Sequence, residues 1–424
     1  MTLANLVWRG GGAVVGTTLF TVLALAQPGP AASGPLRTAP TEKFTVNPGF
    51  RDWARATLAG TTILSGNSSN RGGLFAVDTV TGKLKWSARP TGTAHGNPFV
   101  STAPAVSGDV VVTPMGNTVV ALSLATGKEL WRGPVAEQGA TVAAAGGLVY
   151  VMGEDNNFRA LDAATGREKW KVAFARGYGS CESVPVVRDG TVYVGASAIV
   201  TPADANRAAT YHRSLFALDA NTGQERWRYS PAATVGRGGI CLTQSIVTAD
   251  TFFGVESATL YAVTLATGRE RWKPLEVRRP VEGRERGVRV FGLVDAGPVL
   301  VGLTPGVMIA FDKGTGQTAW EVPGQYRENA PSTAVAGRVL YFQGHPGATP
   351  ASPNQGTITY VGGRPAPSVP ALPGGRLNAL DLDTRAILWS FSRPTAEANW
   401  SFGYVTPVDG GLWVDSYQAL VKLQ

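Results

Sequence analysis

The chain has 424 residues, of which only 16% are charged, and it contains 53 glycines and 28 prolines. So many glycines and prolines are typical of a β protein that is dense in turns. The formal net charge of +8 favours anionic partners, but no stripe of alternating aromatic and basic residues is visible, and we expect no binding to nucleic acid.

Residues 1–26 have the pattern of a secretory signal peptide. Arg9 precedes an apolar stretch at residues 13–25, and small residues form a cleavage site before Gln27. The stretch is short for a transmembrane helix, although an uncleaved anchor stays open. Residues 27–45 are rich in Pro, Ala, Gly and Thr, which predicts a flexible leader. We expect an exported protein of the periplasm or cell envelope, at most peripheral to the membrane.

Residues 46–424 are dominated by one repeat: Ala, a variable residue, usually Asp, two more residues, Thr-Gly, three residues and Trp. Apolar and polar residues alternate on both sides of a polar break, which predicts a hairpin. The Gly suits a left-handed position of the turn, and the Asp accepts hydrogen bonds from backbone amides of the turn. The seven copies end at Trp86, Trp131, Trp170, Trp227, Trp272, Trp320 and Trp389.

A second strand pair precedes each hairpin, as in residues 184–194, so the repeating unit is a four-stranded antiparallel sheet. One such sheet cannot bury both faces alone, and radial stacking of several sheets solves this. The repeat resembles the tryptophan-docking motif of the PQQ-type β-propellers over residues 53–424. The resemblance implies that each Trp packs between neighbouring blades, close to the motif Ala and Gly. Arg385 replaces the Gly of the seventh copy, which predicts a strained turn or one of another type.

We predict an all-β fold: an eight-bladed β-propeller whose ring is closed by pairing of the N- and C-terminal strands. Three strands after residue 404 end in a motif Ala, Ala419, and no Trp follows. Residues 51–55 are predicted to supply the missing fourth strand, with Trp53 as the eighth docking residue. A ring of seven blades with a stray terminal sheet is the alternative.

Two cysteines, Cys181 and Cys241, lie at corresponding places in consecutive blades. In an exported protein this predicts a disulfide, with two buried free thiols as the alternative. Their separation fits neither a CxxC redox pair nor a haem site.

The loops that join blades are expected to form the functional face, because binding residues concentrate on loops held by a rigid scaffold. Arginines recur in these loops and could bind an acidic partner segment, a phosphate or an anionic glycan; a solvated loop of mixed charge is the plain alternative. The candidates are Arg176, Arg237, Arg278, Arg279, Arg284, Arg286, Arg289 and Arg327. No catalytic or metal-binding motif is found, and the role of the insertion at residues 343–376 stays open.

The resemblance implies two functions. The BamB-type proteins are non-catalytic scaffolds of similar length that bind periplasmic partners, so it implies an envelope or outer-membrane partner, such as a β-barrel assembly component, and no cofactor. The quinoprotein dehydrogenases hold PQQ with calcium, but their adjacent Cys-Cys pair and their acidic site residues have no counterpart here. A propeller that binds glycan or cell wall is a third possibility.

Overall fold

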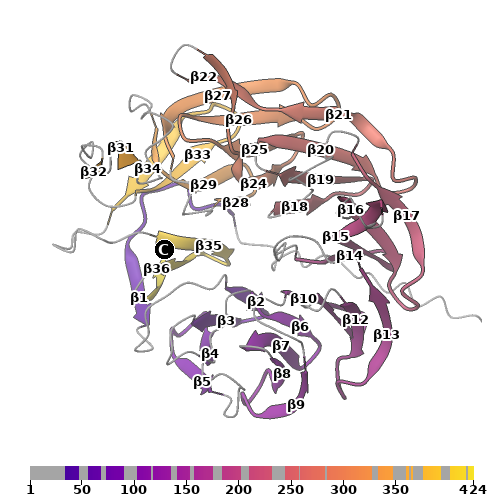
Figure 1. The fold of residues 1–424 in the computed structure, drawn as a ribbon. Helices are drawn as coiled ribbons and strands as arrows, with labels where there is room; N and C mark the ends of the chain where they lie inside the picture. Colours follow the sequence, from indigo (N-terminus) through magenta and orange to yellow (C-terminus); the bar gives the residue numbers. More distant parts are fainter. Residues whose placement is uncertain are drawn as a thin grey trace, which may run out of the picture.

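The computed structural model describes residues 34–46, 56–67, 73–89, 103–115, 118–134, 141–152, 157–174, 184–201, 210–231, 244–256, 258–281, 284–326, 333–346, 360–361, 364–365, 376–392, 402–416 and 419–424. Eight antiparallel blades are arranged around a ring, which confirms the predicted fold class (Figure 1). Within these residues, no helix is long and apolar enough to cross a membrane.

The strands of each blade follow one another in the chain. Blades 1 to 4 comprise β2 (Thr57–Ala59), β3 (Thr62–Asn67), β4 (Gly73–Asp78) and β5 (Leu84–Ala88); β6 (Ala105–Ser107), β7 (Val110–Met115), β8 (Thr118–Ser123) and β9 (Glu129–Pro134); β10 (Thr141–Ala145), β11 (Leu148–Met152), β12 (Asn157–Asp162) and β13 (Glu168–Ala173); and β14 (Val186–Arg188), β15 (Thr191–Thr201), β16 (Thr210–Asp219) and β17 (Glu225–Tyr229).

The second half of the ring keeps this order with two exceptions: a short strand that follows the second strand of blade 7 joins blade 6, and the first strand of the chain joins blade 8. Blades 5 to 8 comprise β18 (Gln244–Val247), β19 (Thr251–Glu256), β20 (Thr259–Thr264) and β21 (Glu270–Glu276); β24 (Phe291–Ala296), β25 (Val299–Leu303), β26 (Val307–Asp312) and β27 (Thr318–Gln325), with β30 (His345–Pro346) as a fifth strand; β28 (Thr333–Ala336), β29 (Val339–Gln343), β33 (Leu377–Asp381) and β34 (Ile387–Phe391); and β35 (Phe402–Val408), β36 (Gly411–Ser416), β37 (Leu420–Leu423) and β1 (Glu42–Val46). The short hairpins β22 (Arg278–Val281) with β23 (Arg284–Gly287) and β31 (Tyr360–Val361) with β32 (Arg364–Pro365) complete the strands that are described.

The hydrophobic core lies between blades. One cluster, for example, combines Leu74 and Trp86 of blade 1 with Val111 and Leu122 of blade 2. Because each cluster needs side chains from two blades, a single blade cannot bury its own apolar faces. In a closed ring every blade has a neighbour on each side, so all eight blades bury both of their apolar faces.

Each motif Trp joins its blade to the next one. The indole N–H of Trp227 donates to the carbonyl of Leu265 at 2.7 Å, and Trp86, Trp131, Trp170, Trp272 and Trp389 make the equivalent bond. The ring lies over a left-handed glycine of the next turn, Gly268 for Trp227, where an added Cβ would be 2.6 Å from the ring. Only a residue without a side chain leaves that space, so the indole and the glycine of the next turn fit together at this seam.

The turn of blade 7 shows what happens without the glycine. Arg385 has φ 63°, and its N–H donates to Asp381 at 2.7 Å, as in the other motif turns. The turn type is thus retained, and the strained alternative is the one observed. Trp320, which faces this turn, is the one motif Trp without an indole hydrogen bond in the part of the chain that is described. At the motif turns that carry a glycine below an indole, an added Cβ would lie 2.6–3.0 Å from that ring, so a side chain at this position crowds the indole.

The fourth strand of blade 8 is β1, which pairs with β37 and closes the ring; the prediction that residues 51–55 supply this strand is therefore wrong. Trp53 lies outside the described residues, and Phe44 of β1 takes the docking place: a Cβ on Gly82 would be 2.6 Å from its ring. The prediction of a flexible leader at residues 27–45 is therefore wrong for its last part. Strand β1 was missed because it carries no Trp.

A lysine takes the place of the motif Ala in blade 8. In seven blades the Ala faces the docking Trp across the hairpin, for example Ala217 opposite Trp227, whereas in blade 8 Lys422 faces Phe44. Ala419, which was predicted to be the motif Ala, lies three residues earlier. The buried Lys422 amine donates to the carbonyl of Thr79 in blade 1 at 2.7 Å. A phenyl ring has no N–H to donate, and the lysine supplies the missing donor from the neighbouring strand.

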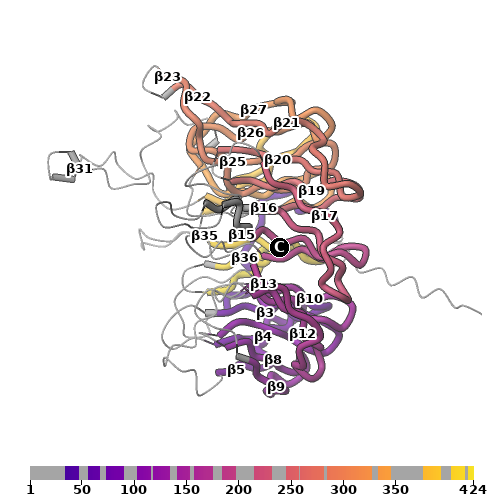
Figure 2. The backbone as a smooth tube through the Cα atoms, turned by 45° about the vertical axis from the view of Figure 1, so that its right-hand side comes forward, coloured from indigo at the N-terminus to yellow at the C-terminus, as the bar shows by residue number. Residues whose placement is uncertain are grey.

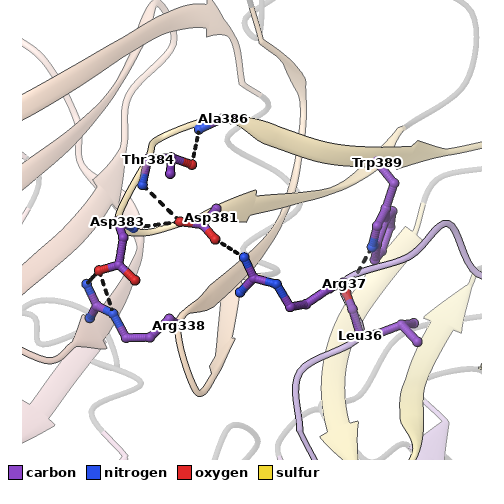
Figure 3. A network of polar contacts seen from close by, with 8 residues as sticks. All are labelled: Leu36, Arg37, Arg338, Asp381, Asp383, Thr384, Ala386 and Trp389. Carbon is purple, nitrogen blue, oxygen red and sulfur yellow. Dashed lines mark hydrogen bonds and ion pairs between the residues drawn. The ribbon is translucent and has the colours of Figure 1, made fainter.

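The residues before β1 complete the outer turn of blade 8 (Figure 3). The carbonyl of Leu36 accepts the indole N–H of Trp389 at 2.9 Å, and the N–H of Leu36 donates to the Tyr341 hydroxyl at 2.7 Å. The Arg37 guanidinium pairs with Asp381 in the turn of blade 7. The backbone amide of Thr384 and the Arg37 guanidinium lower the pKa of Asp381 to about 2. Residues 36–46 thus supply the turn contacts and the outer strand of blade 8.

We expect Trp227→Ala to lower the free energy of unfolding by about 3–5 kcal/mol, because it empties an inter-blade contact and removes a hydrogen bond. Urea denaturation followed by circular dichroism measures this change. Leu130→Ala, on an outer strand and half exposed, is the control and should change stability by less than about 0.5 kcal/mol. Equal effects of the two substitutions would contradict the docking role.

We expect Lys422→Ala to destabilise the protein by about 1–3 kcal/mol, because the Thr79 carbonyl loses its donor. The double variant Lys422→Ala with Phe44→Trp should regain most of this loss, since it recreates the Ala–Trp pair of the other blades. Urea midpoints of the wild type, both single variants and the double variant form the double-mutant cycle. Additive effects of the two changes would show that Lys422 does not replace the indole N–H.

Candidate functional site

One face of the ring carries the connections between blades and between the second and third strands of each blade. The opposite face carries the tight turns, including all the motif turns. Most connections of the first face lie outside the described residues. Its largest described feature is the hairpin β22–β23, which leaves the outer strand of blade 5 and extends beyond the blades (Figure 2). This hairpin is the candidate partner-binding site.

The base of the hairpin is fixed in the core. Val277, Val288 and Val290 are buried in the cluster that joins blades 5 and 6. The N–H of Val277 donates to Ala258 and the N–H of Val288 donates to Val277, both at 2.8 Å. The sequence predicted a loop here, because the many arginines leave no alternation of apolar and polar residues that would indicate two short strands. A strand pair anchored by three buried valines presents its side chains with less ordering cost than a loop does.

The register of the hairpin divides its arginines between two faces. Arg279 is paired directly with Arg286, and Arg284 lies on the same face because it pairs with Val281. Arg278 lies on the other face, together with Glu285. Like charges directly opposite each other on neighbouring strands repel. The face with Arg279, Arg284 and Arg286, which we call the arginine face, therefore favours an anionic group.

Acidic residues of the blades hold two of these arginines. The Arg279 guanidinium pairs with Glu321 of β27, so the arginine face is tied to blade 6. The Arg278 guanidinium pairs with Glu276 of β21 at 2.8 Å. Arg284, Arg286 and Arg289 are exposed. The arrangement positions guanidinium groups for carboxylate or phosphate oxygens, the geometry that arginine binds best.

Several predicted site residues lie outside the described residues. These are Arg176, Arg237 and Arg327, both cysteines of the predicted disulfide, Cys181 and Cys241, and Trp53. Their roles stay predictions. Of the eight predicted arginines, the structure brings Arg278, Arg279, Arg284, Arg286 and Arg289 together on one hairpin and its flank.

A buried carboxyl group was missed by the sequence analysis. Asp415 follows Trp413 by two residues on β36 and faces blade 1, where the backbone N–H of Ala56 donates to it. Its Oδ2 and the Trp413 indole N–H are buried without a hydrogen-bond partner in the described structure. Burial raises the pKa of Asp415 to about 8. The protonated form is therefore the form that this site favours at neutral pH.

The same position in the other blades shows that the acid is exceptional. The position of Asp415 is two residues after the residue of the second strand that pairs with the motif Ala, or with Lys422 in blade 8. In blades 1 to 7 it holds Gly66, Pro114, Met152, Gly195, Val255, Leu303 and Gln343. Six of these lack a polar side chain, and Gln343 donates to the Gly403 carbonyl of the next blade at 3.3 Å. Alignment of the second strands would have revealed Asp415.

The aspartates of the motif turns hold those turns together. The carboxylates of Asp78, Asp162, Asp219, Asp312 and Asp381 accept N–H groups of their own turns. Three of them also pair with the basic residue before the docking Trp: Asp78 with Lys85, Asp162 with Lys169 and Asp219 with Arg226. No group of three or more His, Cys, Asp or Glu residues that could hold a metal ion is found where the structure describes the chain.

Comparison with known proteins identifies the family. The family profile described as outer membrane protein assembly factor BamB matches residues 100–230, 212–356 and 256–419. The chain belongs to the BamB family. No curated protein matches it.

Solved structures share the fold of this BamB-family chain at low identity. BamB from Moraxella catarrhalis has 15% identity and a TM-score of 0.61, and the match covers 91% of this chain and 99% of that one. A europium-containing methanol dehydrogenase has 13% identity and a TM-score of 0.58, covering 90% and 85% of the two chains. The C-terminal WD40 domain of Sif2 has 11% identity and a TM-score of 0.59, covering 91% and 98%. At these identities the likeness concerns the fold alone.

The raised pKa of Asp415 predicts how the stability of the protein depends on pH. The unfolded state releases the proton near the ordinary pKa of 3.8 and the folded state near 8, so the folded state binds more protons between these values. Wild-type stability should therefore fall as pH rises from about 4 to about 8, by up to about 1.4 kcal/mol per pH unit.

Asp415→Asn and Asp415→Leu should both remove this contribution, and Asp415→Leu restores the apolar character of the position. Urea denaturation at a series of pH values between 4 and 9 measures the slope for each protein. An unchanged slope in both variants would contradict the burial of a protonated carboxyl group.

Proposed function

We propose that the protein is an exported, non-catalytic scaffold of the periplasm or cell envelope that binds a protein partner through its loop face. In this proposal the partner belongs to outer-membrane or envelope protein assembly, and a β-barrel assembly component is the leading candidate. Membership in the BamB family supports this role. The predicted signal peptide agrees with the proposed location.

The observation that carries the proposal is the anchored hairpin on the loop face. Its base is part of the core of blades 5 and 6, whereas Arg284 and Arg286 at its outer strand are exposed. A rigid scaffold lowers the entropy that a partner loses on binding. Arginines are among the residues that most often dominate binding energy at protein interfaces.

A quinone-binding dehydrogenase is the second candidate function, favoured by the fold that the chain shares with a methanol dehydrogenase. Reconstitution with PQQ and calcium tests it. A stoichiometric quinone spectrum with dye-coupled oxidation of an alcohol or sugar would overturn the scaffold proposal.

The scaffold proposal is tested by crosslinking in native envelope extracts, followed by identification of the captured proteins. The triple variant Arg279→Ala, Arg284→Ala, Arg286→Ala should reduce capture of the partner at least about tenfold, which corresponds to about 1.4 kcal/mol. The matched control is Lys83→Ala, Lys128→Ala, Arg167→Ala, which removes the same charge from exposed turns of the opposite face. Equal capture by the wild type and the hairpin variant would exclude the arginine face as the contact surface.

A further inference from the structure

The seam between blades 8 and 1 differs from the other seams in which strand carries the inter-blade hydrogen bond. At six seams the donor is an indole on the outermost strand, as in Trp170 to Ala220 at 3.0 Å. At the seam of blades 8 and 1 the donor is Lys422, which lies on β37, one strand further in. The hydrogen bond to blade 1 therefore does not depend on the outermost strand β1.

Strand β1 is held by backbone bonds, by the Phe44 ring and by Val46, which packs against the hydrophobic cluster between blades 8 and 1. It pairs with β37 over Glu42–Val46, and Thr41 and Gln424 exchange backbone hydrogen bonds of 2.8 and 3.0 Å. Glu42, Lys43 and Thr45 are exposed, and Phe44 is the side chain that lies over Gly82. Backbone pairing of this kind accepts any extended segment, and the absence of a side chain at Gly82 leaves room for an aromatic ring.

The remaining contacts of the N-terminal segment also suit its own sequence. The Leu36 carbonyl receives the Trp389 indole, and Arg37 pairs with Asp381 (Figure 3). Together with Phe44 they define a binding register of about ten residues along the outside of blades 7 and 8. The segment that satisfies all three contacts is residues 36–46 of this chain.

We propose that the outer edge of blade 8 is a strand-acceptor site that residues 36–46 fill within one chain, and that it accepts the same segment from a second copy. Only nine residues connect Val46 with Ala56, so a segment that leaves its own blade 8 stays close to its own blade 1. Exchange of an identical element between two copies needs no new contact surface. While the segment is bound to the other copy, the Lys422 hydrogen bond still joins blades 8 and 1 of its own ring.

Within one chain the segment competes strongly with any added strand, because a short connection gives an effective concentration on the order of millimolar. The test therefore uses the full-length chain with Phe44→Ala, which weakens its own segment. The probe is a fluorescent synthetic peptide of residues 34–46. We expect 1:1 binding to this variant, and at least tenfold weaker binding to the wild type.

Two controls separate strand acceptance from unspecific binding. A peptide with Phe44→Ala should bind the Phe44→Ala chain at least tenfold more weakly than the native peptide does. The full-length double variant Phe44→Trp with Lys422→Ala should bind no peptide, because its own strand then carries both the ring and the hydrogen bond. If the Phe44→Ala chain is unfolded by circular dichroism, recovery of its spectrum on addition of the native peptide is the supporting result.

Exchange between copies is measured by analytical ultracentrifugation of wild-type protein refolded at low and high concentration. A dimer fraction that rises with concentration, and that is absent in the double variant, is expected. The proposal is overturned if the Phe44→Ala chain takes up no native peptide, if both peptides bind it equally, or if the wild type is monomeric at every concentration.

Discussion

The structure depends on one contact that recurs around the ring: an aromatic side chain of one blade lies over a left-handed residue in the turn of the next. The contact combines apolar burial with a hydrogen bond to a carbonyl, so it fixes both the distance and the orientation of neighbouring blades. Gly127, Gly166, Gly223 and Gly268 show the same crowding, because a Cβ on any of them would lie 2.6–2.7 Å from an indole. A blade that makes this contact with both of its neighbours cannot shift relative to either of them.

Departures from this contact occur at two seams, and each has a local consequence. Arg385 keeps the left-handed turn but leaves Trp320 without its hydrogen bond. At the closing seam, Phe44 replaces the indole and Lys422 replaces its donor. The closing seam also contains Asp415, so two ionisable residues, Lys422 and Asp415, are buried there. Burial shifts the pKa of each toward its neutral form, downward for Lys422 and upward for Asp415.

The rigid ring and the candidate site have separate physical origins. Turns, docking residues and paired acids serve the packing of blades and are satisfied within the ring. The hairpin β22–β23 contributes buried valines to this packing, but its like-charged arginines are not explained by packing. The exposed guanidinium groups of this hairpin are the feature on which the proposed binding of an anionic partner rests. This separation is consistent with a fold that hosts both scaffolds and dehydrogenases.

The sequence by itself determined the blades and their number, and it predicted a docking place for seven tryptophans, because each motif encodes a complete local hairpin with its turn residue and its docking side chain. It did not reveal β1, since the eighth motif is divided between the two ends of the chain and has Lys422 and Phe44 in place of Ala and Trp. Trp53 was predicted to be the eighth docking residue because it is a Trp, whereas Phe44 does not match the motif. The hairpin of residues 278–287 and the burial of Asp415 were likewise decided by tertiary structure. Asp415 contacts Ala56, near the other end of the sequence, and the hairpin is fixed by contacts with the two blades that flank it in the chain. No local pattern records such contacts.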